Sequence, residues 1–288
     1  MRSNGFIVVI DLALKEINDS MLNAYRKTLI LGAFRENVYF TPGLDLVTLN
    51  PSLSHFYHPR LPGGIIPFVW PGPKAMGNFH FRKSIKKFLA GKKAAAFVQL
   101  GRVSHLLTDM ACPVHAQSVF HSTDPFEWAV ESMKDELLHS SIPSTCFDSS
   151  VSSLIGSLAR FTQDFQAEKT NNPWGYILKR TGILSKIKSD LVRSQVKTLI
   201  PQAASHTIRL FELFLRGIGS RQIVPSEETI MDETLQCLEM SRTGLDRWFR
   251  QMEQFCLQHG GRNYYSEILD LIAECRGRAF ASLANARP

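Results

Sequence analysis

The sequence predicts an all-α protein built as a bundle of several helices. Apolar residues recur at helical spacing through most of the chain, and no alternating strand pattern persists. With 288 residues, 44% of them hydrophobic and 20% charged, the chain can form one large domain or a domain with an appendage. We therefore expect a bundle in which the most apolar helix is central.

The first element is expected to be a helix at residues 5–19. The opening stretch MRSNGFIVVIDLALKEIN has a short basic start and an apolar run, as a secretory signal has. Asp11 interrupts that run, however, and no small-residue cleavage site follows. No run of 18 apolar residues occurs anywhere, so no membrane-spanning helix is expected either.

The later elements follow from the period of the apolar residues. Helices are expected at 20–36, 80–110, 125–139, 148–168, 186–219, 226–258 and 262–284. Residues 37–79 hold many prolines and glycines and are expected to form a long irregular segment, which His55 marks as functional. The two helices beyond residue 219 are expected to form a hairpin that packs on the bundle or makes a subunit contact.

Five potential metal ligands fall within 23 residues of one another: His105, Asp109, His115, His121 and Glu127. Imidazole nitrogens and carboxylate oxygens are the ligands that zinc or a similar divalent ion takes in proteins. Because His105 and Asp109 are four residues apart, they project from one face of a helix. A surface ion pair would explain this spacing equally well, but the surrounding helix is apolar. Metal coordination would offset the free-energy cost of burying two polar groups there.

The stretch FVQLGRVSHLLTDMACPVHAQSVFHSTDPFEWAVE resembles the core motif of the zinc-dependent phospholipase C family, which shares its fold with zinc-dependent single-strand nucleases. SHFY at 54–57, with Pro59, resembles a second motif of that family. GAFREN at 32–37 resembles a third, and 199–214 resembles its closing helix. The resemblance covers about residues 5 to 217. It implies a helical bundle around a buried metal cluster at 1–219, with 220–288 as a C-terminal helical extension.

The resemblance also implies zinc as the cofactor, with one to three ions and two expected. The residues that resemble the ligands of one ion are His115, His121 and Glu127, and those that resemble the ligands of a second are His55, His105 and Asp109. In a full family site Asp109 would bridge to a third ion. The first-helix histidine that binds the third ion in the family has no counterpart, because no histidine precedes His55.

Glu36 and Asn37 are the candidate catalytic residues. Asn37 falls where the family has an acidic ligand that is also proposed as a general base, and an amide cannot accept a proton at neutral pH. The neighbouring Glu36 is therefore expected to substitute for it.

Cys112 is interpreted as a small buried residue, although a thiolate ligand is an alternative. His80 is expected to begin a helix, as a cap or a surface residue.

These observations favour a metal-dependent phosphodiester hydrolase, phospholipase C-like, that uses a metal-bound water on a phospholipid or another phosphodiester. A zinc-dependent single-strand nuclease and a metal-binding protein without hydrolytic activity are the alternatives. The net charge of +7 favours anionic partners and a peripheral membrane contact. The densest basic patch, at 82–93, is interpreted as a solvated helix face. Nucleic acid is the less favoured partner, because aromatic residues do not interleave with basic ones near the motif.

Five scattered cysteines without a CxxC pair predict no disulfide framework. The localisation and the oligomeric state stay open.

Overall fold

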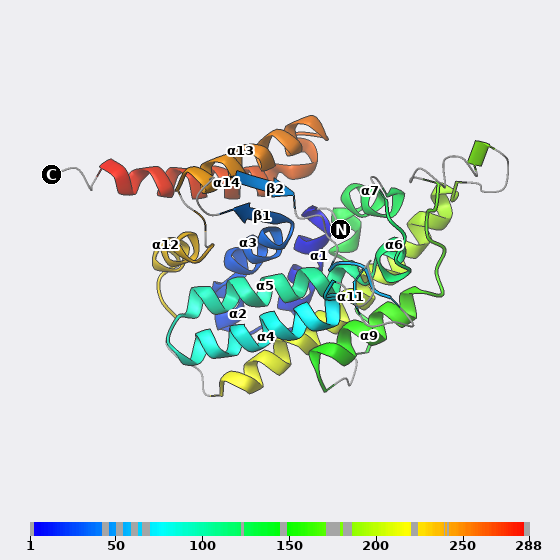
Figure 1. Ribbon diagram of the computed structural model, residues 1–288, viewed down its shortest axis with the longest axis horizontal. Helices are drawn as coiled ribbons and strands as arrows, with labels where there is room; N and C mark the ends of the chain where they lie inside the picture. Colours follow the sequence, from blue (N-terminus) through cyan, green and yellow to red (C-terminus); the bar gives the residue numbers. More distant parts are fainter. Residues whose placement is uncertain are drawn as a thin grey trace.

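The computed structural model describes residues 3–41, 46–49, 54–58, 63–64, 70–121, 124–144, 149–170, 179–180, 186–219, 224–238, 240 and 242–284. Within these residues the protein is a helical bundle, which confirms the predicted all-α class (Figure 1). The helices are α1 (Ser3–Ile17), α2 (Ser20–Ala24), α3 (Arg26–Glu36), α4 (Pro73–Leu89), α5 (Lys93–Asp109), α6 (Pro113–Ala116), α7 (Pro125–Ser132), α8 (Lys134–Leu137), α9 (Val151–Thr162), α11 (Ser189–Ile218), α12 (Glu227–Cys237), α13 (Arg242–Gln258) and α14 (Arg262–Ala284).

A short β-hairpin departs from the expectation that no strand would form. Strands β1 (Val38–Thr41) and β2 (Leu46–Leu49) pair antiparallel, with Val38 opposite Leu49. Strands of four residues are too short to give a clear alternating pattern, which explains why periodicity did not predict them. None of the described helices combines the length and the apolar character that crossing a membrane would require.

Helices α1 and α5 form the centre of the bundle. Every residue of α5 from Ala94 to Asp109 is buried except Arg102, and α1 is buried from Asn4 to Leu14 except at Asp11. A helix that is apolar around its whole circumference must be covered on all sides, and α3, α4 and α11 pack against α5 while α11, α3 and α7 pack against α1. The motif-bearing helix is therefore central, as predicted, and it shares that position with α1.

Helices α3 and α5 approach each other closely at two glycines. A Cβ atom added to Gly32 would lie 2.3 Å from the carbonyl oxygen of Val98. One added to Gly101 would lie 2.1 Å from the carbonyl oxygen of Leu29. Only glycine fits at either position, because the contacts are with backbone atoms that cannot turn aside. This crossing places the C-terminal end of α3 beside the polar residues of α5.

The helix expected at 80–110 is in fact two helices, so that prediction was wrong. Helix α4 starts at Pro73, a residue type favoured in the first helical turn. The chain reverses at Ala90–Lys92, where Gly91 adopts a φ of +76° that other residues rarely take. This correction moves His80 from a helix start to the middle of α4, where it is buried.

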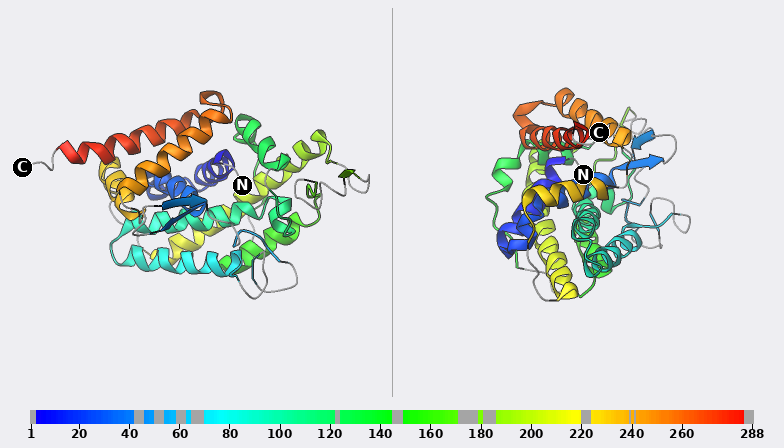
Figure 2. Two further views of the ribbon diagram at one scale, coloured as in Figure 1. Left: turned by 45° about the horizontal axis from the view of Figure 1, so that its top comes forward. Right: turned by 90° about the vertical axis from the view of Figure 1, so that its left-hand side faces the viewer.

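Helices α12 to α14 pack on the bundle, and α13 and α14 lie side by side above it (Figures 1 and 2). Arg26 of α3 binds both Asp11 of α1, with Nε to Oδ1 at 2.6 Å, and Glu267 of α14. Lys134 also contacts Glu267, at 2.9 Å. Buried apolar residues of α12, α13 and α14 belong to the same core as those of α1 and α5. The division at residue 219 stays a prediction, although α11 does end at Ile218.

Candidate metal centre

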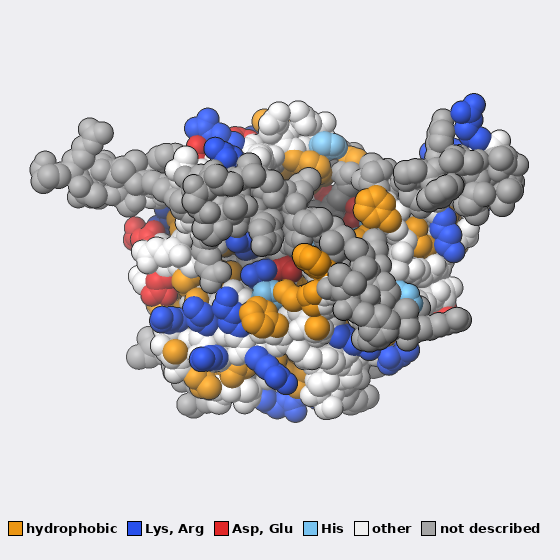
Figure 3. All heavy atoms as spheres, in the orientation of Figure 1, with side chains coloured by type: hydrophobic (Ala, Val, Ile, Leu, Met, Phe, Trp, Pro, Cys, Tyr) orange, Lys and Arg blue, Asp and Glu red, His pale blue; other side chains and the backbone are white. Residues whose placement is uncertain are grey.

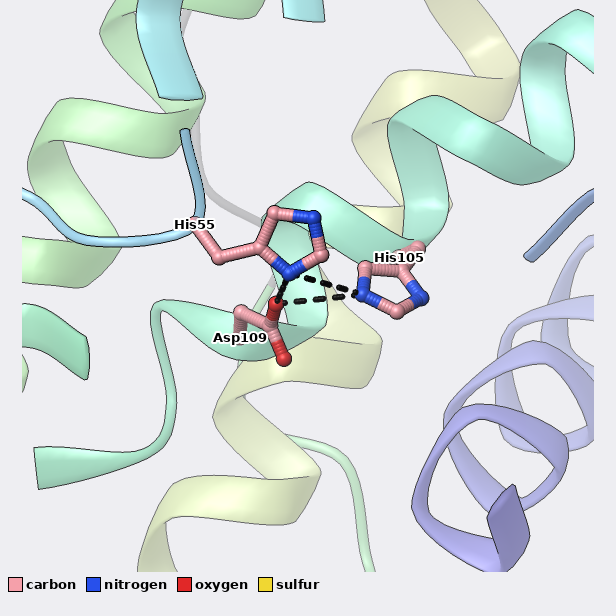
Figure 4. A group of neighbouring side chains, drawn as sticks. All are labelled: His55, His105 and Asp109. Carbon is pink, nitrogen blue, oxygen red and sulfur yellow. Dashed lines mark hydrogen bonds and ion pairs between the residues drawn. The ribbon is translucent and has the colours of Figure 1, made fainter. Parts of the chain in front are cut away.

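Three buried side chains converge at the C-terminal end of α5. His105 and Asp109 lie one turn apart on this helix, and His55 reaches them from the segment 54–58 (Figure 4). The Oδ2 atom of Asp109 is 2.9 Å from Nδ1 of His55 and 3.2 Å from Nε2 of His105. The two imidazole nitrogens are themselves 3.2 Å apart. The helical spacing of His105 and Asp109 therefore does place both on one face, and that face is inside the protein.

The surroundings of His105 leave Nε2 as its ligand atom. Its Nδ1 atom lies 2.8 Å from the backbone carbonyl of Ala33, an acceptor, so Nδ1 carries the proton. The ring also stacks on Phe6, with centroids 4.0 Å apart. Burial lowers the pKa of His105 to about 4, so the ring is neutral and its Nε2 lone pair points at the group.

These three residues fit a small divalent ion. Ligand atoms held at zinc-like distances in a tetrahedron are about 3.3 Å apart, close to the separations of the three atoms here. Without a cation, a protonated His55 would place a positive charge beside Asp109. Burial opposes that charge, but the carboxylates of Asp109 and Glu36 raise the pKa of His55 to about 9. A bound cation would take over this role, which is how metal binding releases protons.

Glu36 extends the group on the side of His55. Its Oε1 atom is 3.8 Å from Nε2 of His55, and its Oε2 atom accepts a hydrogen bond from Nε of Arg102 at 2.5 Å. Burial opposes ionisation of Glu36, but His55 and the charge of Arg102 hold its pKa below the ordinary value. A carboxylate near Nε2 favours the His55 tautomer with the proton on that atom, which leaves Nδ1 as the ligand.

His80 lies next to Glu36, a position that the sequence did not predict. Its Nε2 atom is 3.7 Å from Oε2 of Glu36, and its Nδ1 atom is 2.8 Å from Oε1 of Gln99. Burial and the charge of Arg102 lower the pKa of His80 to about 4, so the ring is neutral. The sequence carries little signal for this position of His80. His80 and Gln99 are 19 residues apart, and they can meet only because the chain turns back at Gly91 between them.

A second group forms where the chain leaves α5. One ligand atom from each of three residues, Cys112, His115 and Glu127, lies within 4.8 Å of the others. The Nε2 atom of His115 is 3.6 Å from Oε1 of Glu127. Both ring nitrogens of His115 are buried and make no hydrogen bond within the described part of the chain. Since a buried polar atom without a partner is costly, this imidazole also fits a metal ligand.

Cys112 enters this group as a thiol. Its sulfur donates to Oδ2 of Asp124 at 3.0 Å, and Oδ1 of Asp124 in turn caps α7 by accepting from the backbone of Phe126. Burial and the nearby Asp124 carboxylate raise the pKa of Cys112 well above the ordinary value. The expectation of a small buried residue thus holds, and the alternative of a metal ligand stays open, since its sulfur is within reach of the group.

Segment 54–58 connects the two groups. His55 belongs to the first, while the ring of Phe56 stacks on His115 with centroids 4.9 Å apart. The backbone N–H of Tyr57 donates to the carbonyl of His115 at 2.9 Å, and the hydroxyl of Ser118 donates to the carbonyl of Tyr57. The SHFY motif therefore fixes the position of the segment after α5. Pro59 of this motif and Cys146 lie outside the described residues.

The structure brings five of the six predicted ligands into the two groups, and His121 and Asn37 are the predicted site residues that fall outside them. His121 lies beside His115, with ring centroids 5.0 Å apart, and its Nδ1 atom is 3.2 Å from the carbonyl of Val119. It is not part of the three-residue group, so its role as a ligand stays a prediction. Asn37 caps the C-terminus of α3 and is half-buried, whereas its neighbour Glu36 is the residue that faces the first group.

The fold and these contacts define an all-α protein with two neighbouring groups of buried histidine, carboxylate and thiol side chains that could hold metal ions. No family model matches the chain. Over 89 residues it is 32% identical to the phospholipase C of Listeria monocytogenes serovar 1/2a (strain ATCC BAA-679 / EGD-e). The matched segment covers 30% of this chain and 30% of that protein, so the chain spans less than a third of its relative. The likeness supports a relationship to a phospholipase C over that segment.

Proposed function

We propose that this protein is a zinc-dependent phosphodiester hydrolase of the phospholipase C type. The observation that carries the proposal is the first group, in which His55, His105 and Asp109 converge within 3.2 Å inside the bundle. The partial likeness to a phospholipase C agrees with it. Arrangements of this kind are costly to bury unless they bind something.

The chemistry of the donor atoms supports zinc over other divalent ions. Imidazole nitrogens, a carboxylate and a nearby thiol suit zinc, while calcium and magnesium take oxygen ligands. His55, His105 and Asp109 would hold one ion, and His115 and Glu127 a second, with Cys112 or His121 completing that set. When bound, such ions supply a water of lowered pKa and positive charge beside a phosphodiester.

The remaining polar residues would orient these ligands. Glu36, held by Arg102, would keep the proton of His55 on Nε2, and the Ala33 carbonyl would keep that of His105 on Nδ1. This role for Glu36 differs from the general base expected at this position. A carboxylate with a lowered pKa and an arginine at 2.5 Å is a weak proton acceptor.

Metal content and turnover together test the proposal. Protein purified without chelator should contain bound zinc and should hydrolyse a chromogenic phosphocholine ester. Its activity should disappear on dialysis against a chelator and return with added zinc. Hydrolysis of single-stranded DNA in place of the ester would favour a nuclease. Bound zinc without turnover of either substrate would identify a metal-binding protein without hydrolytic activity.

The role of Glu36 can be tested separately by Glu36→Gln. Loss of a group that orients a metal ligand typically lowers metal affinity by about 10–100-fold. We therefore expect the zinc concentration at half-maximal activity to rise by that factor, with kcat at saturating zinc largely restored. The measurement is a zinc titration of ester hydrolysis. The matched control is Glu136→Gln, which makes the same change at an exposed ion pair with Lys197 and should leave the titration unchanged.

A different result would reassign Glu36. If Glu36→Gln lowers kcat at every zinc concentration and leaves the zinc affinity unchanged, the carboxylate acts as a proton acceptor, as the sequence suggested. Such proton transfer typically contributes about 10²–10⁴-fold to a rate.

A further inference from the structure

The outer face of α4 carries basic and apolar side chains together. Phe79, Arg82, Lys86 and Leu89 follow one another at intervals of three or four residues, so they lie along one side of the helix. All four are exposed, with Phe79 at 55% and Leu89 at 66% of their full accessible surface. Exposed apolar side chains that share one surface with each other can mark an interaction site.

A further basic residue flanks this stripe. Lys83 lies over the ring of Phe79, at 6.0 Å from its centroid. Figure 3 shows rows of lysine and arginine side chains along α4, with hydrophobic side chains between them. We refer to Phe79, Arg82, Lys83, Lys86 and Leu89 as the α4 face.

The positive charges of Arg82 and Lys86 are not balanced by ion pairs within the described residues. The sequence has no aspartate or glutamate between Asp45 and Asp109. Helix α9, which packs on α4, has no acidic residue, and α5 has none before its last residue, Asp109. Neither Arg82 nor Lys86 makes an ion pair within the part of the chain that the structure describes. The face therefore calls for an anionic partner that also accepts apolar side chains.

We propose that the α4 face docks the protein on the surface of an anionic phospholipid bilayer. Lysine and arginine would contact lipid headgroups, and the Phe79 and Leu89 side chains would enter the boundary with the acyl chains, as in other interfacial amphipathic helices. The choice of a lipid surface over another polyanion rests on the proposed function. A flat basic helix for nucleic acid would have no need of exposed Leu89.

The position of α4 connects this surface to the candidate metal centre. His80 follows Phe79 directly and points inward, to 3.7 Å from Glu36. One side of α4 would thus contact the lipid while the other contacts the polar cluster around His55. The separation between the two sides is about the diameter of a helix, roughly 10–12 Å. Docking would hold the candidate centre close to the headgroup layer, where the phosphodiesters lie.

Sedimentation with vesicles tests the proposal without any turnover. The protein should bind vesicles of phosphatidylcholine with about a third phosphatidylserine at low salt, and bind pure phosphatidylcholine vesicles less. Each basic residue near an anionic surface strengthens binding by about fivefold. Arg82→Glu/Lys86→Glu should therefore weaken binding by at least about 25-fold. Lys186→Glu/Lys188→Glu makes the same change at exposed residues before and at the start of α11, and should weaken it far less.

The apolar residues provide a second arm. Phe79→Ser/Leu89→Ser should weaken binding by about tenfold, because both side chains lose buried area in the lipid. This loss should persist at about 1 M salt, where charge effects are screened to within about 3 Å. The effect of the charge variant should fade under the same conditions.

Several outcomes would overturn the proposal. One is a native protein that does not sediment with anionic vesicles at low salt, and another is a control variant that loses binding as much as the α4 variant does. Binding to single-stranded DNA that only the α4 variants lose, with vesicle binding intact, would assign the face to nucleic acid.

Hydrolysis of a soluble ester separates the docking proposal from the proposed function. Ester hydrolysis without vesicle binding refutes docking alone, and vesicle binding without ester hydrolysis refutes the proposed function alone.

Discussion

Asp109→Asn is expected to abolish phosphodiester hydrolysis while leaving the fold in place. The substitution keeps the shape of the side chain but removes the charge that His55 and His105 face at 2.9 and 3.2 Å. An amide oxygen is a poor ligand for zinc in comparison with a carboxylate. Because Lewis-acid stabilisation by a metal contributes several kcal/mol, the expected loss in kcat/KM is at least about a thousandfold.

The bound zinc and the thermal stability report the same change independently of activity. Zinc present at about 1,000 times its dissociation constant stabilises a folded protein by about 4 kcal/mol, equivalent to a rise in Tm of roughly 7 °C for a chain of this size. The Asp109→Asn variant should bind less zinc than the native protein, and zinc should raise its Tm by less. The control is Asp164→Asn at an exposed position, which should behave as the native protein does. Unchanged zinc content and turnover in Asp109→Asn would contradict the proposed site.

Gly101→Ala is expected to destabilise the protein by about 3 kcal/mol, at the upper end of the range for overpacked cores. The added methyl group would lie 2.1 Å from the carbonyl oxygen of Leu29, so α3 and α5 would have to separate. Separation would also lengthen the contact between His105 and the Ala33 carbonyl. Denaturant unfolding gives the free energy of unfolding, and zinc affinity reports the displacement of His105.

Gly277→Ala is the matched control, because Gly277 also lies inside a helix, α14, with no atom within 4 Å of an added Cβ. There alanine should stabilise the helix by roughly 0.5–1 kcal/mol. If both variants are stabilised equally, the close approach of α3 and α5 at Gly101 does not exist in solution.

The sequence predicted the helical class and the placement of His105 beside Asp109, because both depend on the spacing of residues that are close in the chain. Helix α11 was expected at 186–219 and runs from Ser189 to Ile218. The four-residue interval between His105 and Asp109 sufficed to place both on one face of α5. His55 joined them in the prediction only through the resemblance of its motif, because no local rule connects residues 50 positions apart.

The errors arose where the path of the chain depends on one residue or on tertiary contacts. Gly91 divides the expected helix at 80–110, and without that turn His80 could not be placed near Glu36. The same limit applies after Pro113, where a helix of only four residues, α6, sets the direction of the chain. Whether Cys112 or His121 lies closer to His115 depends on this short segment, and no period in the sequence encodes it.

The link between Arg26 and Glu267 has a consequence for how the protein is made. These residues are 241 positions apart, so at roughly 5–20 residues per second a ribosome adds Glu267 about 10–50 s after Arg26. During that interval α3 lacks its contact with α14, and until Thr234 is added the Thr28 hydroxyl, which later pairs with Thr234 at 2.8 Å, has no partner in α12. The nascent bundle must therefore keep an uncovered face out of contact with other chains until translation has passed α14. The packing of α12 and α14 on α3 is therefore a late step in the maturation of the protein.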